Sequence, residues 1–267
     1  MKTFVKKILS DSISRKVKKI YLFARGIAYY GTNYHCNICG KSFRKFLPGG
    51  FDLPIIKEMD IIGAGRRNHI CPNCQSTDRD RLIKSFFDIN QELLSDNKTV
   101  LHIAPEPSLY NFLKKYKNIK YIPAAKYHEG IYYPKEMTLV DLTSMQFANN
   151  EFDIIICNHV LEHIEDHKTA LKEIYRVLVK KGIAILQVPY SLKLKNTHEN
   201  PEIKSEKDRE KYFGQFDHVR LYGSDYTDIL KSAGFKLNEF IAEDNISPNK
   251  IEKMKLFANE TLFVVNK

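Results

Sequence analysis

Residues 140–189 read VDLTSMQFANNEFDIIICNHVLEHIEDHKTALKEIYRVLVKKGIAILQVP and contain two apolar runs on either side of a helical pattern. The runs are FDIIIC at 152–157 and IAILQVP at 183–189, both short and rich in branched apolar residues, as buried strands are. The intervening helix is expected to open near His163 and to end before the turn at Lys181 and Gly182. This order predicts two parallel strands joined by a crossover helix.

The same alternation extends in both directions from this stretch. Further strands are expected at TVLHIA (99–104), IKYIPA (119–124) and MTLV (137–140), with helices opening near Pro107 and Ser224. Such alternation predicts an α/β fold with a doubly wound parallel sheet that binds its ligand at the C-terminal strand ends. The end of the chain differs, because AGFKLNEFIA (233–242) and ETLFVVNK (260–267) predict a final pair of strands without a full helix between them.

The composition is that of a globular protein. The chain has 267 residues, of which 43% are hydrophobic, which suits one mid-sized domain with an appendage. No stretch approaches the roughly 20 apolar residues of a membrane span, and the first residues lack an apolar core followed by a cleavage site. We therefore expect a cytoplasmic location.

The positive charge is concentrated at the N-terminus. Residues 1–30 carry eight Lys or Arg against the single Asp11, which is +7 of the formal net charge of +10, so the main body gives no indication of a nucleic-acid groove. On a helical wheel this segment separates into a basic face and an apolar face, the latter formed by Val5, Ile8, Leu9, Ile13, Val17, Ile20, Phe23, Ala24 and Ile27. Two alternatives remain open: the apolar face packs on the body, or the helix lies on an anionic membrane surface.

Four of the five cysteines form two CxxC pairs, Cys36 with Cys39 and Cys71 with Cys74. Two such pairs present four thiolates to one zinc ion, and Gly40 eases the turn after the first pair. A redox pair would not need a second copy, and disulfides are disfavoured in a reducing cytosol, so we predict a structural zinc site. The 31 residues between the pairs are expected to form a loop or hairpin. Cys157, alone in an apolar run, is expected to be a buried hydrophobe.

The chain is thus divided into three parts: a basic amphipathic helix at 1–30, a zinc-binding module with its linker helix at 31–95, and an α/β domain at 96–267. The linker helix is expected in STDRDRLIKSFFDINQELL (76–94), with Ser76 or Thr77 as its N-cap.

The α/β part resembles the class I S-adenosylmethionine-dependent methyltransferases, in particular the small-molecule branch called type 11. The residues that carry the resemblance are VLHIAP at the first strand, the stretch 140–189 and the late LKSAGFKL. The resemblance covers about residues 98–267 and implies a Rossmann-like methyltransferase sheet with an antiparallel C-terminal strand pair, preceded here by the small zinc-binding module.

The resemblance also implies S-adenosylmethionine as cofactor and positions for it. It places Asp141 and Leu142 beside the adenine, with the Asp141 carboxylate accepting from the exocyclic amine. Asn158 and His159 would border the methionine part. The first loop, from His102 through Ala104 to Glu106, would pass beneath the cofactor.

Two positions differ from the pattern of the resembled enzymes. The first loop has no glycine, whose value lies in positive φ and close backbone approach, and its prolines at 105 and 107 have a fixed φ near −65°. The second strand, in YIPAAKYHEG, has no evident acidic residue at its end to bind the ribose. Glu106 is therefore the expected substitute.

The motif HVLEH at 159–163 also matches the HxxEH pattern of inverted zinc peptidases. It follows directly on an apolar strand rather than lying within a long helix, which argues against a peptidase. Glu162 with His163 resembles the carboxylate–histidine pair with which some methyltransferases of this fold hold a divalent metal; the two residues could instead cap the next helix or bond to backbone. His159, His163 and His218 are the candidate bases for a transfer reaction.

The expected function is methyl transfer from S-adenosylmethionine to a small-molecule or glycan-like acceptor. The alternative, from another class, is a non-catalytic methyltransferase-like module that recruits partners or membrane through its zinc ribbon and basic helix. The sequence identifies neither the acceptor atom nor the oligomeric state.

Overall fold

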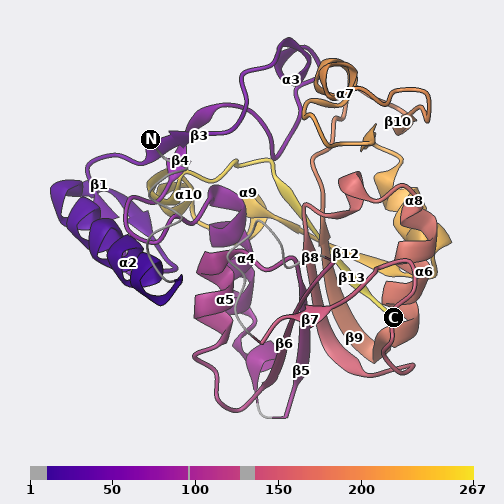
Figure 1. The fold of residues 1–267 in the computed structure, drawn as a ribbon, viewed down its shortest axis with the longest axis horizontal. Helices are drawn as coiled ribbons and strands as arrows, with labels where there is room; N and C mark the ends of the chain where they lie inside the picture. The colour runs from indigo at the N-terminus through magenta and orange to yellow at the C-terminus, as the bar shows by residue number, and fades with distance from the viewer. Residues whose placement is uncertain (1–10, 96, 127–135) are drawn as a thin grey trace.

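The computed structural model describes residues 11–95, 97–126 and 136–267 (Figure 1). The N-terminal part contains α2 (Asp11–Ala28), β1 (Tyr30–Cys36), β2 (Lys41–Phe43), β3 (Leu47–Gly49), α3 (Pro54–Glu58), β4 (Arg67–Ile70), α4 (Asp78–Ile89) and the 3-10 helix η1 (Gln91–Leu94). Strand β1 pairs with β2, and β3 pairs with β4, both antiparallel, so the segment between the cysteine pairs holds a helix and parts of two small sheets rather than a single hairpin. Helix α4 begins with a capping box between Thr77 and Asp80, as expected for one of the two predicted caps.

The remaining elements build the α/β part. They are β5 (Thr99–Ile103), α5 (Pro107–Leu113), β6 (Lys120–Ala125), β7 (Thr138–Leu139), β8 (Phe152–Asn158), η2 (Leu161–His163), α6 (His167–Val177), β9 (Leu178–Gln187), β10 (His198–Glu199), α7 (Glu206–Phe213), β11 (Arg220–Leu221), α8 (Tyr226–Ser232), β12 (Lys236–Ile241), α9 (Ala242–Asn245), α10 (Pro248–Met254) and β13 (Thr261–Asn266).

The central sheet has seven strands in the order β12-β13-β9-β8-β5-β6-β7. The pairs from β9 to β7 are all parallel, whereas β13 is antiparallel to both of its neighbours. The predicted Rossmann-like sheet with an antiparallel C-terminal pair is confirmed. Strand order reverses between β5 and β8, and a crevice for ligands opens at the C-terminal ends of strands at such a point.

Two helical layers cover the sheet, because the side chains of each buried strand alternate between its faces. Ile154 and Ile156 of β8 pack in the cluster that contains α4 and α5, whereas Ile155 and Cys157 pack in the cluster that contains α6 and α8. Figure 1 shows the two helix pairs on opposite sides of the sheet. Cys157 is buried, as expected.

Two predicted element bounds are corrected. The helix expected near His163 begins at His167, because the Asp166 carboxylate caps it by accepting from the Thr169 amide, 3.0 Å away; residues 161–163 form η2 instead. Two short helices, α9 and α10, also lie between the last two strands, where we expected no full helix.

The apolar face of α2 does not pack on the body. Val17, Ile20, Phe23 and Ile27 are 53–69% exposed, so the packed alternative is wrong for this stretch. The predicted face members at positions 5, 8 and 9 lie outside the described residues. Within the part that the structure describes, no helix combines the length and the apolarity that crossing a bilayer requires.

Two parts of the chain cover the C-terminal strand ends. One is residues 188–225, between β9 and α8, which we call the roof segment, and the other is the N-terminal part. Ile56 and Ile61, from α3 and the residues after it, share a small apolar cluster with Phe213 and Leu221. Ile62 also pairs with Tyr190 as an isolated bridge directly after the end of β9. The N-terminal module is thereby attached to the edge of the sheet where ligand is expected (Figure 1).

Candidate functional site

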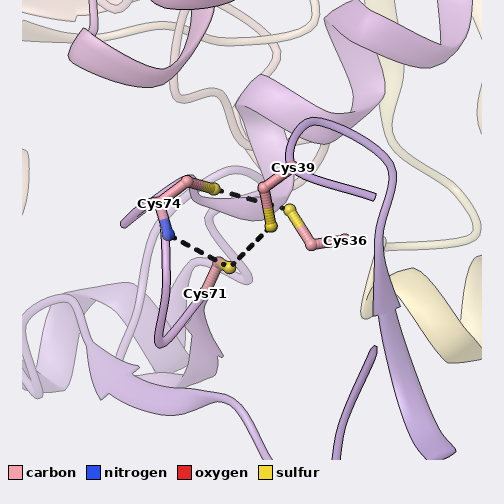
Figure 2. Close-up of side chains that lie close together, drawn as sticks. All are labelled: Cys36, Cys39, Cys71 and Cys74. Carbon is pink, nitrogen blue, oxygen red and sulfur yellow. Dashed lines mark hydrogen bonds between the residues drawn. The ribbon is translucent and has the colours of Figure 1, made fainter. Parts of the chain in front are cut away.

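The four predicted metal ligands meet in one cluster. Figure 2 shows the side chains of Cys36, Cys39, Cys71 and Cys74 converging from two turns. The Sγ atoms of Cys36 and Cys74 are 3.6 Å apart and those of Cys39 and Cys71 are 3.7 Å apart, too far for disulfides, and all four are free thiols. A tetrahedral ion with bonds of about 2.3 Å to sulfur requires S···S edges of about 3.8 Å.

The two turns that present the thiols have the same local geometry. In each, the residue after the second cysteine takes a left-handed φ, +68° at Gly40 and +64° at Gln75, and its amide donates to the carbonyl of the first cysteine. The Ser76 hydroxyl lies 3.1 Å from Cys36 Sγ and 3.2 Å from Cys74 Sγ, which fixes their orientation. Four converging sulfurs at tetrahedral spacing fit a closed structural metal site.

The first loop of the α/β part adopts a left-handed turn without glycine. Ala104 has φ +46°, and its amide donates to the Ala124 carbonyl over 2.7 Å, so the loop stays against β6. Pro107 then opens α5 at a position where its fixed φ suits the first turn. The glycine-free loop therefore does contain a residue at positive φ, which is Ala104.

Glu106 is held at the centre of the strand ends by two side chains. His102 Nε2 lies 3.1 Å from one carboxylate oxygen, and the Asn158 amide donates to the other over 2.5 Å. Burial alone would raise the pKa of Glu106, but the His102 contact outweighs it and lowers the pKa. An ionised carboxylate thus lies between β5 and β8, where the strand order reverses.

Asp141 follows β7 at the same edge of the sheet. One carboxylate oxygen accepts from the Thr143 amide and hydroxyl at 2.9 and 2.7 Å, and the other lies 3.0 Å from the Lys126 ammonium. The Thr143 contacts, and after them Lys126, lower the pKa of Asp141 to about 2. Leu142 beside it is buried. The stretch YIPAAKYHEG continues from Lys126 into residues that lie outside the described ranges.

Asn158 and His159 complete this edge. Among the described residues, no group forms a hydrogen bond with Asn158 Oδ1 or with His159 Nε2, both of which are buried. His159 has φ +53°, and burial, with a smaller contribution from Arg79, lowers its pKa to about 4, so its imidazole is neutral at physiological pH. The carboxylates of Glu106 and Asp141 and the unpartnered Asn158 oxygen are acceptors, which suit the ammonium, ribose hydroxyl and adenine amine donors of S-adenosylmethionine.

A cavity of about 330 Å³ opens on the other side of His159. Its walls come from the N-terminal module, from the end of β8 with η2, and from the roof segment around α7. The lining includes Gly63, Arg67, His69, Arg79, His159, Glu162, His163, Phe213 and His218. It does not include Glu106 or Asp141, so the cavity lies next to the expected cofactor groups rather than over them.

All three candidate bases line this cavity around Glu162. His159 Nδ1 is 3.3 Å from Glu162 Oε1, and the Nε2 atoms of His163 and His218 are each 4.0 Å from it. Burial opposes ionisation of Glu162, but the adjoining imidazoles outweigh it and lower its pKa to about 2. The structure therefore brings His159, His163 and His218 together, although the last two lie 55 positions apart in sequence.

Sequence reasoning missed the contribution of the N-terminal module to this cavity. The buried Asp78 carboxylate, at the start of α4, receives Arg67 Nε at 2.9 Å and His69 Nδ1 at 2.8 Å, and so holds both side chains at the cavity wall. The stretch GAGRRNH at 63–69 could have indicated this wall, because it combines two glycines with two arginines and a histidine. In the structure, Gly63 and Gly65 both take positive φ. Only the folded chain brings this stretch to the strand ends.

Comparison with known proteins gives a family match for the central part of the chain. A family model described as "Methyltransferase domain" matches residues 95–186, which span β5 to β9. No curated protein gave a match.

Solved structures similar to this chain include three of low sequence identity. An S-adenosylmethionine-dependent methyltransferase from Archaeoglobus fulgidus is 16% identical with a TM-score of 0.45, covering 70% of this chain and 94% of its own. The YcgJ protein of Bacillus subtilis is 14% identical with a TM-score of 0.45 (69% and 96%). An S-adenosylmethionine-dependent methyltransferase from Mesorhizobium loti is 10% identical with a TM-score of 0.44 (68% and 98%).

Proposed function

We propose that this protein, whose residues 95–186 match the methyltransferase-domain family model, transfers a methyl group from S-adenosylmethionine to a small-molecule or glycan-like acceptor bound in the cavity beside His159. The family match favours this catalytic role over the non-catalytic alternative. The observation that carries the acceptor site is the position of the cavity, which adjoins the strand ends where the cofactor groups converge.

The bound cofactor supplies an electrophilic methyl group on its sulfonium. We expect Glu106 and Asp141 to accept from its ribose and adenine, with Leu142 beside the adenine and the loop from His102 through Ala104 beneath it. Asn158, whose amide already orients Glu106, offers its unpartnered oxygen at the end of β8. These residues position the cofactor and are not required to move a proton.

A proton acceptor is available in the cavity. His159 is neutral at physiological pH, and its unpartnered Nε2 can take the proton of an attacking hydroxyl or amine. Arg79 adds positive charge to the wall contributed by the N-terminal module, where Arg67 is already paired with Asp78. Polar acceptors with an anionic or polyhydroxyl portion suit such a wall.

The experiment for this function has two stages. Calorimetry should show S-adenosylmethionine binding to the purified chain, and incubation with radiolabelled cofactor and pooled polar metabolites and glycans should then label an acceptor. Absence of binding at millimolar cofactor would contradict the proposal for the whole site. Binding without labelling of any hydroxyl- or amine-bearing acceptor would contradict the acceptor class.

Two accessory roles are also proposed. The four-cysteine cluster binds one structural zinc ion, supported by its tetrahedral S···S spacing. Helix α2 lies on anionic membrane, supported by its exposed apolar face and its basic residues. The cytoplasmic location stays a prediction.

A further inference from the structure

We propose that the cavity holds a second metal site, in which Glu162, His163 and His218 bind a divalent first-row transition-metal ion next to the acceptor. The site would differ in kind from the cysteine cluster, because its ligands are one carboxylate oxygen and two imidazole nitrogens. The inference concerns metal binding itself, and its test does not depend on methyl transfer.

The first support is a buried carboxylate that lacks hydrogen-bond partners. Glu162 is 1% exposed, and neither of its carboxylate oxygens receives a hydrogen bond from the part of the chain that the structure describes. His159 Nδ1 approaches Oε1 at 3.3 Å without the alignment of a hydrogen bond. Burying an unsatisfied carboxylate costs several kcal/mol, so such groups are normally paired or coordinate metals.

The second support is the protonation pattern of the two histidines. His218 Nδ1 lies 3.3 Å from the Phe213 carbonyl, and His163 Nδ1 lies 3.2 Å from the Asp217 carbonyl and 3.4 Å from its carboxylate. A backbone carbonyl can only accept, so each Nδ1 must carry the proton. Both Nε2 atoms then present a lone pair toward Glu162, as metal-binding histidines do when their other nitrogen is held by an acceptor.

The third support is the convergence of the three ligand atoms. Each Nε2 is 4.0 Å from Glu162 Oε1, and all three atoms lie within 4.8 Å of one another. Metal–ligand bonds of about 2.1 Å require ligand separations of about 3.0–3.4 Å, so the side chains need to close by about an ångström in each pair. His163 and the Asp217 that holds it are partly exposed, which leaves them room for this movement.

The ligand set also indicates the class of ion. Two imidazoles and one carboxylate suit manganese, iron, cobalt or zinc better than magnesium or calcium, which prefer oxygen ligands. Three protein ligands leave further coordination positions open, as in catalytic rather than structural metal sites. Those positions face the cavity, where an acceptor oxygen could occupy one of them.

Manganese is the probe that separates this site from the cysteine cluster. Thiolate clusters select zinc, whereas Mn²⁺ binds nitrogen and oxygen ligands and is weakest in the order of divalent affinities, so it leaves zinc at the cysteines. Added Mn²⁺ can be followed through the electron paramagnetic resonance signal of the free ion. We expect the zinc-loaded full chain to bind one equivalent.

Three variants test the assignment. E162Q keeps the shape of the side chain, and H163Q and H218Q each remove one imidazole. We expect every one of them to weaken Mn²⁺ binding at least tenfold while the zinc content is unchanged. H198Q is the matched control, because His198 is exposed in β10 and lies outside the cavity lining; it should bind Mn²⁺ like the parent.

The outcomes separate this proposal from the proposed function. No Mn²⁺ binding at millimolar ion, or equal binding by the parent and by folded E162Q and H163Q, overturns the metal site. If S-adenosylmethionine still binds in that case, the proposed function stands without it. Mn²⁺ binding that is lost in the variants supports the site even if no acceptor is ever labelled.

Discussion

Ala104 adopts the positive φ that the sequence pattern led us to expect only of glycine. Glycine takes positive φ at no steric cost, and an L-residue pays about 1–2 kcal/mol in the left-handed region. Ala104 pays that cost at φ +46°, and its amide hydrogen bond to Ala124 helps to hold the turn. Both prolines follow the left-handed residue, at positions 105 and 107, and neither occupies that position. Such a compensation cannot be predicted from composition, because it depends on a neighbouring strand.

Glu106 is the residue whose substitution best tests the cofactor pocket. Glu106→Gln removes the negative charge, while His102 and Asn158 remain to hold the side chain. We expect S-adenosylmethionine binding to weaken by roughly 1.5–3 kcal/mol, the usual value of a hydrogen bond to a charged group. Calorimetry measures it, and circular dichroism should show an intact fold. An unchanged dissociation constant would mean that Glu106 does not replace the missing ribose carboxylate.

Glu260 predicts a specific pH dependence of stability. Its side chain is buried, and burial, reinforced by the nearby Asp78 carboxylate, raises its pKa to about 8. The folded state therefore binds this proton more tightly than the unfolded state does, so the contribution of Glu260 to stability is greatest below about pH 4 and falls as pH rises toward 8. We expect Glu260→Gln to be more stable than the parent at pH 8 by on the order of 3–4 kcal/mol, with the difference vanishing near pH 4. Urea unfolding across this range tests it, and equal pH slopes would count against it.

At the scale of elements, the sequence predicted the strands well because each buried strand is a short apolar run bounded by turns. β8 and the FDIIIC run coincide to within one residue, and β5 and β6 lie within one residue of their predicted ends. The segment between β9 and α8 is polar and irregular, so no periodicity showed that it covers the strand ends. The sequence also could not predict that GAGRRNH lies next to the roof segment, since this placement depends on pairing between positions 62 and 190.

The cysteine knuckles predict a metal-dependent module. Cys39→Ser leaves three thiolates around an incomplete site, so we expect loss of the zinc and local unfolding around β1, β2 and the β3–β4 pair. Elemental analysis should fall from one zinc per chain to much less, and hydrogen exchange should rise first in residues 31–75. Cys157→Ser is the control, because Cys157 is buried in the sheet and away from the cluster. Retention of one zinc by Cys39→Ser would remove it from the ligand set.

Helix α2 predicts a membrane affinity that depends on both charge and apolar contact. Ile20 is 69% exposed, so Ile20→Ser should leave the fold unchanged. Removing its contribution of about 1.5–3 kcal/mol should weaken binding to anionic vesicles about tenfold or more. Salt should weaken binding of the parent, because screening at physiological ionic strength acts over about 8 Å. Flotation measures both, and equal binding to neutral and anionic vesicles would argue against this surface role.

At the scale of the whole molecule, the predicted zinc-binding module and the α/β part share one hydrophobic core. Phe43 and Leu82 of the N-terminal module belong to the same buried cluster as Val100 of the sheet and Met254 of α10. The division of the chain at residues 30 and 95 stays a prediction. In the structure, the zinc-binding module and the α/β part pack against each other in one buried cluster. A site formed from both units, with Arg67 on one wall and Glu162 on the other, then has a fixed geometry.

Arg81 is the residue whose substitution best tests whether the zinc-binding module and the sheet stabilise each other. Its guanidinium is fully buried and donates to the carbonyls of Met254 at 2.7 Å, His69 at 2.8 Å and Ser76 at 3.0 Å, which joins α4 to both α10 and the second knuckle. Arg81→Ala leaves three buried carbonyls without their donor and opens a cavity beside Phe46. We expect it to lower the free energy of unfolding by about 3 kcal/mol or more.

The loss should extend to the sheet as well as to the module. If the two form one cooperative unit, the far-ultraviolet dichroism of Arg81→Ala should show a single urea transition at lower midpoint, and amides of β5 and β8 should exchange faster together with those of α4. Arg44→Ala is the matched control, because Arg44 lies in the same module with an exposed side chain and should change stability by no more than about 0.5 kcal/mol. Two separate transitions, with the sheet amides as protected as in the parent, would show that the module is only attached to the sheet and does not stabilise it. The shared cavity wall would then depend on the docking of two independent units, and the affinity for an acceptor would be lost before the sheet itself unfolded.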